Sequence, residues 1–153
     1  MDLSVFRHPF PEFKTISMIC GGTGITPMYQ ALQLMYPGSD TKVKMLYGNK
    51  TADDILLKKE LDEMAASNPN FELVHVVGDS PTDKPAGWDG EFGWIDEDKI
   101  KKFCFAPSPD TGVFVCGLPA MYAALCGPRD QKEVASDTVL NKLGYSDSMV
   151  VKF

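Results

Sequence analysis

The sequence has few cysteines and histidines, and their spacing suggests neither a zinc site nor histidine catalysis. Its four cysteines include no Cys-x-x-Cys pair and no histidine at zinc-site spacing: Cys20, Cys104, Cys116 and Cys126. Only two histidines occur, His8 and His75, and neither belongs to a recognisable pair with a nucleophile or an acid. We therefore expect reduced thiols, no metal and no histidine catalysis.

Long apolar runs, a signal sequence and an excess of basic residues are also missing. No apolar run reaches the length of a transmembrane helix, and the first residues lack the order of a signal peptide. The net charge of −6 argues against nucleic acid and anionic membrane surfaces as partners. We expect one globular domain in the cytosol, or at the cytosolic face of a membrane if a parent protein carries an anchor, with no membrane contact from this chain.

Two common phosphate-binding patterns are absent as well. There is no Gly-x-x-x-x-Gly-Lys-Ser/Thr string, and the spacing of Gly21, Gly22 and Gly24 is not Gly-x-Gly-x-x-Gly. A kinase or P-loop NTPase is therefore not expected.

What the sequence does contain is an apolar run, Ile16 to Cys20, that leads directly into a glycine-rich turn, Gly21 to Gly24. This order predicts a strand, a turn and a helix start. Glycine leaves backbone N–H groups uncovered, and a helix N-terminus favours an anion, so diphosphate is the natural ligand. Thr23 and Thr26 add hydroxyls, and Pro27 suits the first helical position. A tight turn without a ligand would give the same pattern.

The rest of the chain alternates between strand and helix signals. Strands are expected at about 15–20, 42–48, 71–77, 112–116 and 149–153, with a loop or small hairpin within 78–93. This alternation predicts an α/β fold: a doubly wound, five-stranded parallel sheet in the order 3-2-1-4-5, with helices on both faces.

Two local expectations accompany this pattern. Asp53 and Asp54 are expected to open the second helix, whose apolar side includes Leu56. His75 is expected to face outward from the third strand because its neighbours alternate.

A second glycine turn follows the fourth strand, in the string Cys116-Gly-Leu-Pro-Ala-Met121. In open α/β sheets, ligands bind outside the carboxyl ends of the strands where the strand order reverses. Turns after the first and fourth strands flank that crevice. Together, the two turns predict one site.

Three ordered motifs carry a family resemblance: Gly21–Pro27, Asn49–Leu57 and Cys116–Met121. With them, the chain resembles the pyridine-nucleotide domain of the ferredoxin reductase superfamily, and most of all its NADH-cytochrome b5 reductase and nitrate reductase branch. The likeness runs from about residue 16 to residue 153 and includes the Trp-Asp-Gly-Glu-Phe-Gly string at 88–93. It departs from the b5 reductase pattern at Leu118 and Ala120, where that pattern has prolines, and at an apparent insertion in 126–137.

The resemblance implies that the chain binds NADH through residues of each motif. The Gly22-Thr23-Gly24 turn would hold the diphosphate, with Thr23 facing nicotinamide and flavin. Residues 49–54 would hold the adenosine ribose, where the Asp54 carboxylate would accept from ribose hydroxyls and repel a 2′-phosphate. The positive charge of Lys50 would have the opposite effect and attract a 2′-phosphate.

The third motif would line the nicotinamide end of the cofactor. Cys116 would lie close to where hydride passes, Gly117 would open the backbone, and Met121 would line the adenosine side. Because hydride transfer needs no thiol nucleophile, a buried structural role for Cys116 stays open. A cysteine hydrolase is not expected, because no base accompanies Cys116.

The resemblance also implies partners. The family's flavin half carries an Arg-x-Tyr-Ser/Thr motif that does not occur here. We therefore expect residues 15–153 to form the NADH-binding domain and residues 1–14 to be a lead-in from a missing FAD-binding domain of the same parent protein. Electrons would pass from NADH to FAD and then to a haem protein or other one-electron acceptor. A stand-alone nucleotide-binding module without catalytic activity is the alternative.

Overall fold

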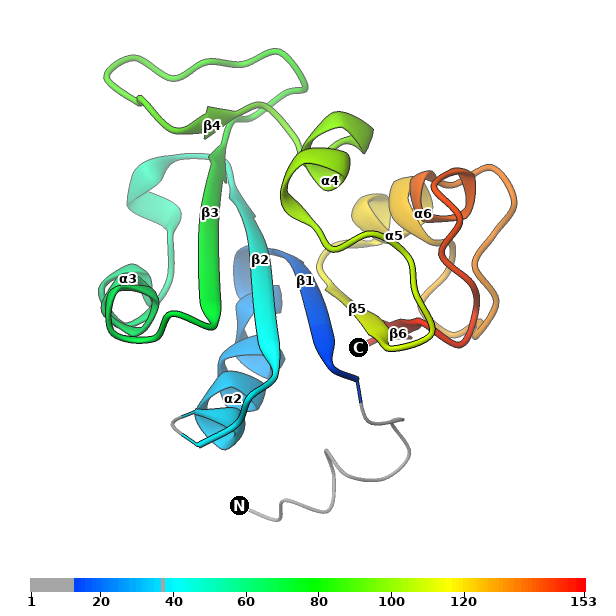
Figure 1. The fold of residues 1–153 in the computed structure, drawn as a ribbon. Helices are drawn as coiled ribbons and strands as arrows, with labels where there is room; N and C mark the ends of the chain where they lie inside the picture. Colours follow the sequence, from blue (N-terminus) through cyan, green and yellow to red (C-terminus); the bar gives the residue numbers. More distant parts are fainter. Residues whose placement is uncertain (1–12, 37) are drawn as a thin grey trace.

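The computed structural model describes residues 13–36 and 38–153, which form a single parallel sheet with helices on both faces (Figure 1). The predicted lead-in therefore lies almost wholly outside the described residues, as does His8. The strands are β1 (Thr15–Gly21), β2 (Lys42–Asn49), β3 (Phe71–Val77), β4 (Glu91–Phe92), β5 (Thr111–Cys116) and β6 (Val150–Lys152). The helices are α2 (Ile25–Met35), α3 (Lys58–Ser67), α4 (Glu97–Phe103), α5 (Pro119–Leu125) and α6 (Val139–Lys142), with single 3₁₀ turns η1 (Gly22–Gly24) and η2 (Ala52–Asp54).

The sheet has the order β4-β3-β2-β1-β5-β6, and every pair of neighbours is parallel. The predicted five strands and their order are confirmed. The expected loop is present at 78–90, and no hairpin forms within it. The sixth strand is the short β4 at its end, which pairs with β3 at Val76 and Val77. β1 is central and buried along almost its whole length, which explains its uninterrupted apolar sequence.

Two apolar layers hold the helices to the sheet. On one face, alternate β1 side chains such as Met18 pack with Leu32 of α2 and Leu61 of α3. On the opposite face, Ile19 packs in a layer with Ile100 of α4 and Leu125 of α5. Buried Ser17 on that face accepts a hydrogen bond from the Phe105 N–H at 2.9 Å, which ties the α4–β5 connection to the sheet.

Two expected helix starts were wrong. Helix α2 begins at Ile25, so Pro27 is its third residue, where a missing N–H is equally harmless because the first four N–H groups of a helix have no partner within it. The second helix does not open at Asp53 and Asp54, which lie in η2. It begins at Lys58, after Leu57 has adopted a left-handed conformation (φ 58°) that interrupts the helical path.

Leu56 and His75 also lie differently from expectation. Leu56 is 48% exposed because it precedes α3 instead of joining its apolar side. The His75 side chain is only 12% exposed, and its Nε2 lies 2.9 Å from Oδ1 of Asp62 on α3. Helix α3 covers this part of β3 and supplies a polar partner, so His75 does not face solvent.

Candidate functional site

The glycine turn after β1 leads directly into a helix. Gly22 has a left-handed backbone (φ 53°), which glycine adopts without strain, and Gly22–Gly24 form a 3₁₀ turn that continues into α2. Thr23 and Thr26 are both exposed. Helix α2 is 11 residues long, so its positive end lies beside backbone N–H groups and two exposed hydroxyls. This arrangement suits an anionic ligand.

The second glycine turn lies directly against the first. A Cβ atom added to Gly24 would lie 2.2 Å from the carbonyl oxygen of Cys116, so only glycine allows the two backbones this approach. Met121 fills the space beside them: its Cε would be 3.0 Å from a Cβ on Gly21, and its Sδ would be 2.6 Å from a Cβ on Gly117. The structure therefore brings together the predicted residues of the first and third motifs.

The turn after β2 lies at the same edge of the sheet, because Gly48 is in register with Gly21. Asn49 ends this strand, and its buried Nδ2 makes no hydrogen bond within the part of the chain that the structure describes. Lys50 and Asp79 form an ion pair of 3.6 Å, with both side chains largely exposed. Asp54 accepts from the Thr51 side chain and backbone N–H, closing a capping box.

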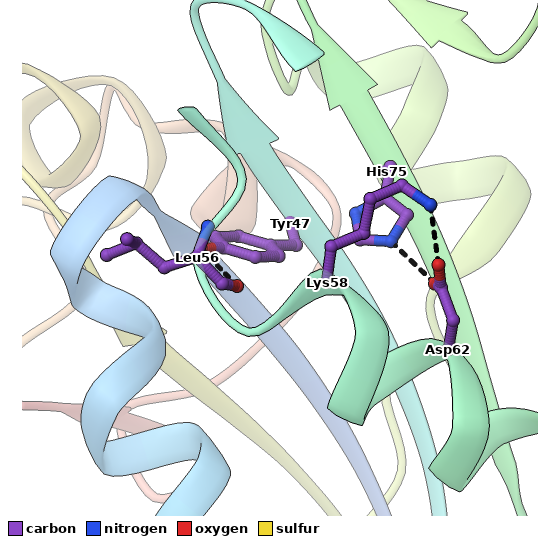
Figure 2. A network of polar contacts seen from close by, with 5 residues as sticks. All are labelled: Tyr47, Leu56, Lys58, Asp62 and His75. Atoms are coloured by element: carbon purple, nitrogen blue, oxygen red, sulfur yellow. Dashed lines mark hydrogen bonds and ion pairs between the residues drawn. The ribbon is translucent and has the colours of Figure 1, made fainter. Parts of the chain in front are cut away.

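Sequence reasoning missed Tyr47, which links the turns after β1 and β2. Its ring is fully buried, and its hydroxyl lies 3.3 Å from the Gly22 carbonyl oxygen. The same hydroxyl lies 3.1 Å from both the N and the O of Leu56 (Figure 2). Burial raises the pKa of the Tyr47 hydroxyl, while contact with the Asn49 side chain and the Leu56 backbone limits the rise. The sequence feature that could have identified Tyr47 is a tyrosine in a buried strand, because its hydroxyl must find a hydrogen-bond partner.

A second polar network lies next to Tyr47 but outside the crevice. Asp62 accepts from Lys58 at 2.6 Å and pairs with His75 at 2.9 Å, and the His75 ring lies 5.8 Å from the ring of Tyr47 (Figure 2). The sheet order places β3 three strands from β5. At about 4.8 Å per strand, His75 is roughly 14 Å from Cys116, too far to act as its base.

Cys20 on β1 and Cys116 on β5 lie side by side on the same face of the sheet. Cys20 and Cys116 are in register, and both belong to the apolar layer under α2. Burial raises the pKa of the Cys20 thiol well above its usual value, and the nearby Cys116 adds to the rise. Within residues 13–36 and 38–153, no group of three or more His, Cys, Asp or Glu side chains is placed to hold a metal.

These features fit a dinucleotide. No atom of residues 13–36 and 38–153 lies within 4 Å of a Cβ placed on Gly22, so the first glycine turn is open at the helix end. Asn49, one residue past the Gly48 that pairs with Gly21, carries a buried Nδ2 without a partner among the described residues. These turns lie at the carboxyl edge of β1, β2 and β5, where ligands bind in open α/β sheets. We refer to this edge as the cofactor crevice.

Comparison with known proteins agrees with this geometry. Residues 18–127 match the family model described as an oxidoreductase NAD-binding domain. The chain belongs to this family, which confirms the expected class of fold and the binding of NAD.

Particular relatives support the resemblance to the cytochrome b5 reductase and nitrate reductase branch. The chain is 42% identical to NADH-cytochrome b5 reductase 2 of Scheffersomyces stipitis, over 99% of the chain and 54% of that protein. It is 44% identical to NADH-cytochrome b5 reductase 2 of Meyerozyma guilliermondii, over 93% of the chain and 49% of that protein. The cytochrome b5 reductase domain of Ulva prolifera nitrate reductase superposes with a TM-score of 0.76 at 33% identity, over 94% of this chain and 51% of that one. The chain spans about half the length of these relatives.

Proposed function

We propose that this chain is the NADH-binding lobe of a flavin-dependent reductase that passes electrons from NADH through FAD to a one-electron acceptor such as cytochrome b5. The observation that carries the proposal is the contact between the two glycine turns, in which Gly24 lies against the carbonyl of Cys116. When bound, NADH supplies a hydride and FAD accepts it and releases single electrons. The choice of cytochrome b5 as the acceptor is supported by the names of the NADH-cytochrome b5 reductases that the chain resembles.

In this proposal the first two motifs bind the diphosphate and the adenosine. The N–H groups from Gly22 to Gly24 and the positive end of α2 bind the diphosphate, and Thr26 and Pro27 line the start of that helix. Asn49 and Asp54 bind ribose hydroxyls. Lys50 stays paired with Asp79, which lowers its attraction for a 2′-phosphate and favours NADH over NADPH.

In this proposal the nicotinamide end of NADH is bound by Thr23, Cys116 and Gly117. The exposed Thr23 hydroxyl orients the ring toward the flavin. Cys116 acts through its position, since hydride transfer needs no thiol nucleophile. Met121, which contacts both glycine turns, keeps them at a fixed separation.

The FAD-binding domain of the same parent protein is the proposed partner at this edge. Leu118 is 73% exposed next to Gly117, and Leu56 is 48% exposed after the turn that follows β2. Large apolar side chains beside a cofactor crevice are suited to burial by a second domain. No helix of residues 13–36 and 38–153 has the length and apolar character needed to cross a bilayer.

The test is a titration of this chain with NADH and NADPH, followed by fusion to the other half of the S. stipitis relative. The chain alone is expected to bind NADH weakly, bind NADPH still more weakly, and reduce no ferricyanide. The fusion should contain flavin and reduce ferricyanide with NADH. Absence of NADH binding in both forms would refute the proposal. Binding without electron transfer in a flavin-loaded fusion would favour the stand-alone module.

A further inference from the structure

The two cysteines at the base of the cofactor crevice form a pair that the proposed hydride transfer does not use. Cys20 and Cys116 are register partners on neighbouring parallel strands and project into the same apolar layer. Adjacent strands lie about 4.8 Å apart, within the roughly 4.4–6.8 Å range of Cα separations that a disulfide spans. All four cysteines are free thiols in the structure.

The two thiols differ in access. Cys20 is fully buried, and burial raises the pKa of its thiol, which keeps it protonated and unreactive toward solutes. Cys116 is partly exposed at the carboxyl end of β5. One sulfur can therefore meet a small oxidant while its partner stays shielded next to it.

We propose that Cys20 and Cys116 are a reversible oxidation site for hydrogen peroxide, with Cys116 as the attacking thiol and Cys20 as the resolving thiol. The Cys116 sulfur attacks one peroxide oxygen and breaks the O–O bond, giving a sulfenic acid and one water. The Cys20 thiol then displaces the sulfenic hydroxyl, giving a disulfide and a second water. The two sulfurs lose two electrons in total, and one hydrogen peroxide is reduced to two waters.

A link at this position acts on both glycine turns at once. Cys20 directly precedes Gly21, and Cys116 directly precedes Gly117. The Cys116 carbonyl already lies against Gly24 with no room to move closer. A disulfide needs its two Cβ atoms about 3.5–4.5 Å apart, which is less than the strand spacing of about 4.8 Å. Forming it therefore shifts the turns that directly follow the two cysteines, so the oxidised form should bind NADH less well. Only this consequence rests on the proposed function, because the disulfide itself does not depend on it.

The test uses the full chain, treated with hydrogen peroxide, alkylated and analysed by mass spectrometry. We expect two of the four thiols to be lost, a linked Cys20–Cys116 peptide, and full recovery with dithiothreitol. Cys20→Ala and Cys116→Ala should each abolish the link. Cys104→Ala and Cys126→Ala are matched controls that should retain it.

Different results of these experiments would overturn different parts of the proposal. Oxidation of Cys116 alone to sulfenic or sulfinic acid would overturn the role of Cys20, and modification of neither residue would overturn the site. NADH titration of reduced and oxidised protein is expected to show a several-fold weaker affinity after oxidation that Cys20→Ala prevents. A disulfide without this change would overturn the coupling to the crevice, whereas failure of the reduced protein to bind NADH would count against the proposed function instead.

Discussion

Asp54 accepts two hydrogen bonds from Thr51, one from the hydroxyl at 2.8 Å and one from the backbone N–H at 3.2 Å. Both end on Oδ2 of an exposed carboxylate, so Oδ1 is the oxygen that a ribose hydroxyl would meet. The residue predicted to select NADH therefore also shapes the turn that presents it.

The first prediction is that Asp54→Thr lowers the ratio of NADH to NADPH affinity by at least about ten-fold. The change removes a charged hydrogen bond worth roughly 1.5–3 kcal/mol and a repulsion against a 2′-phosphate. Titration of both cofactors measures the ratio. Asp53→Thr, at the neighbouring position of the same turn, is the matched control and should leave it unchanged. An equal ratio in both variants would mean that Asp54 only caps its turn.

The second prediction concerns the contact between the glycine turns. Gly24→Ala places a methyl group 2.2 Å from the Cys116 oxygen, a backbone atom that cannot rotate away. We expect a loss of unfolding free energy above about 3 kcal/mol, at the upper end of overpacking costs, and loss of NADH binding. Gly22→Ala meets no atom within 4 Å but has a left-handed backbone, so it should cost only about 1–2 kcal/mol. Urea denaturation measures both losses, and a larger loss for Gly22→Ala than for Gly24→Ala would contradict this prediction.

The third prediction separates two buried tyrosines. Tyr47→Phe removes the hydroxyl that links Gly22 to Leu56, whereas Tyr36→Phe removes one that donates to the carbonyls of Thr41 and Asn70, before β2 and β3. Each variant should lose about 1–3 kcal/mol of unfolding free energy, since backbone groups lose a partner. Only Tyr47→Phe should weaken NADH binding. Equal effects on NADH would show that the link between the turns has no part in cofactor binding.

The fourth prediction is a pH dependence at Asp62. Partial burial opposes ionisation, but hydrogen bonds from Lys58 and His75 outweigh it and lower the pKa of the Asp62 carboxyl. A lowered pKa in the folded state gives a stabilisation that is complete above the ordinary value of 3.8 and is lost as the pH falls through the folded-state value.

Asp62→Asn should therefore reduce the unfolding free energy at pH 7 by about 0.5–1 kcal/mol, a small amount because solvent screens this partly exposed group. The deficit should shrink below about pH 4. Glu63→Gln, which removes a surface pair with Lys59 on the same helix, is the control and should have a smaller effect. A deficit that grew toward acid would contradict this assignment.

The sequence predicted the parallel sheet and the position of both glycine turns at one edge of it because the signals are local. The apolar run of β1 and the glycines that follow it are contiguous, and the topology of α/β sheets then brings Gly24 to Cys116. Tyr47 was missed because its partners, Gly22 and Leu56, come from separate segments. The start of α3 was misplaced because the Asp54 capping box closes a separate turn and Leu57 adopts a backbone conformation that leucine rarely takes.

The pairing of β1 with β5 also has a consequence for folding kinetics. Thr15 and Thr111 share a 2.8 Å hydrogen bond at the start of these strands although 96 residues separate them. Closing so long a loop is slow, and the cofactor crevice does not exist before it happens. NADH would then bind only the fully assembled sheet. At a concentration 100 times its Kd, it would add about 2.7 kcal/mol to the stability of the whole domain, so cofactor supply would shift the balance between folded and unfolded protein.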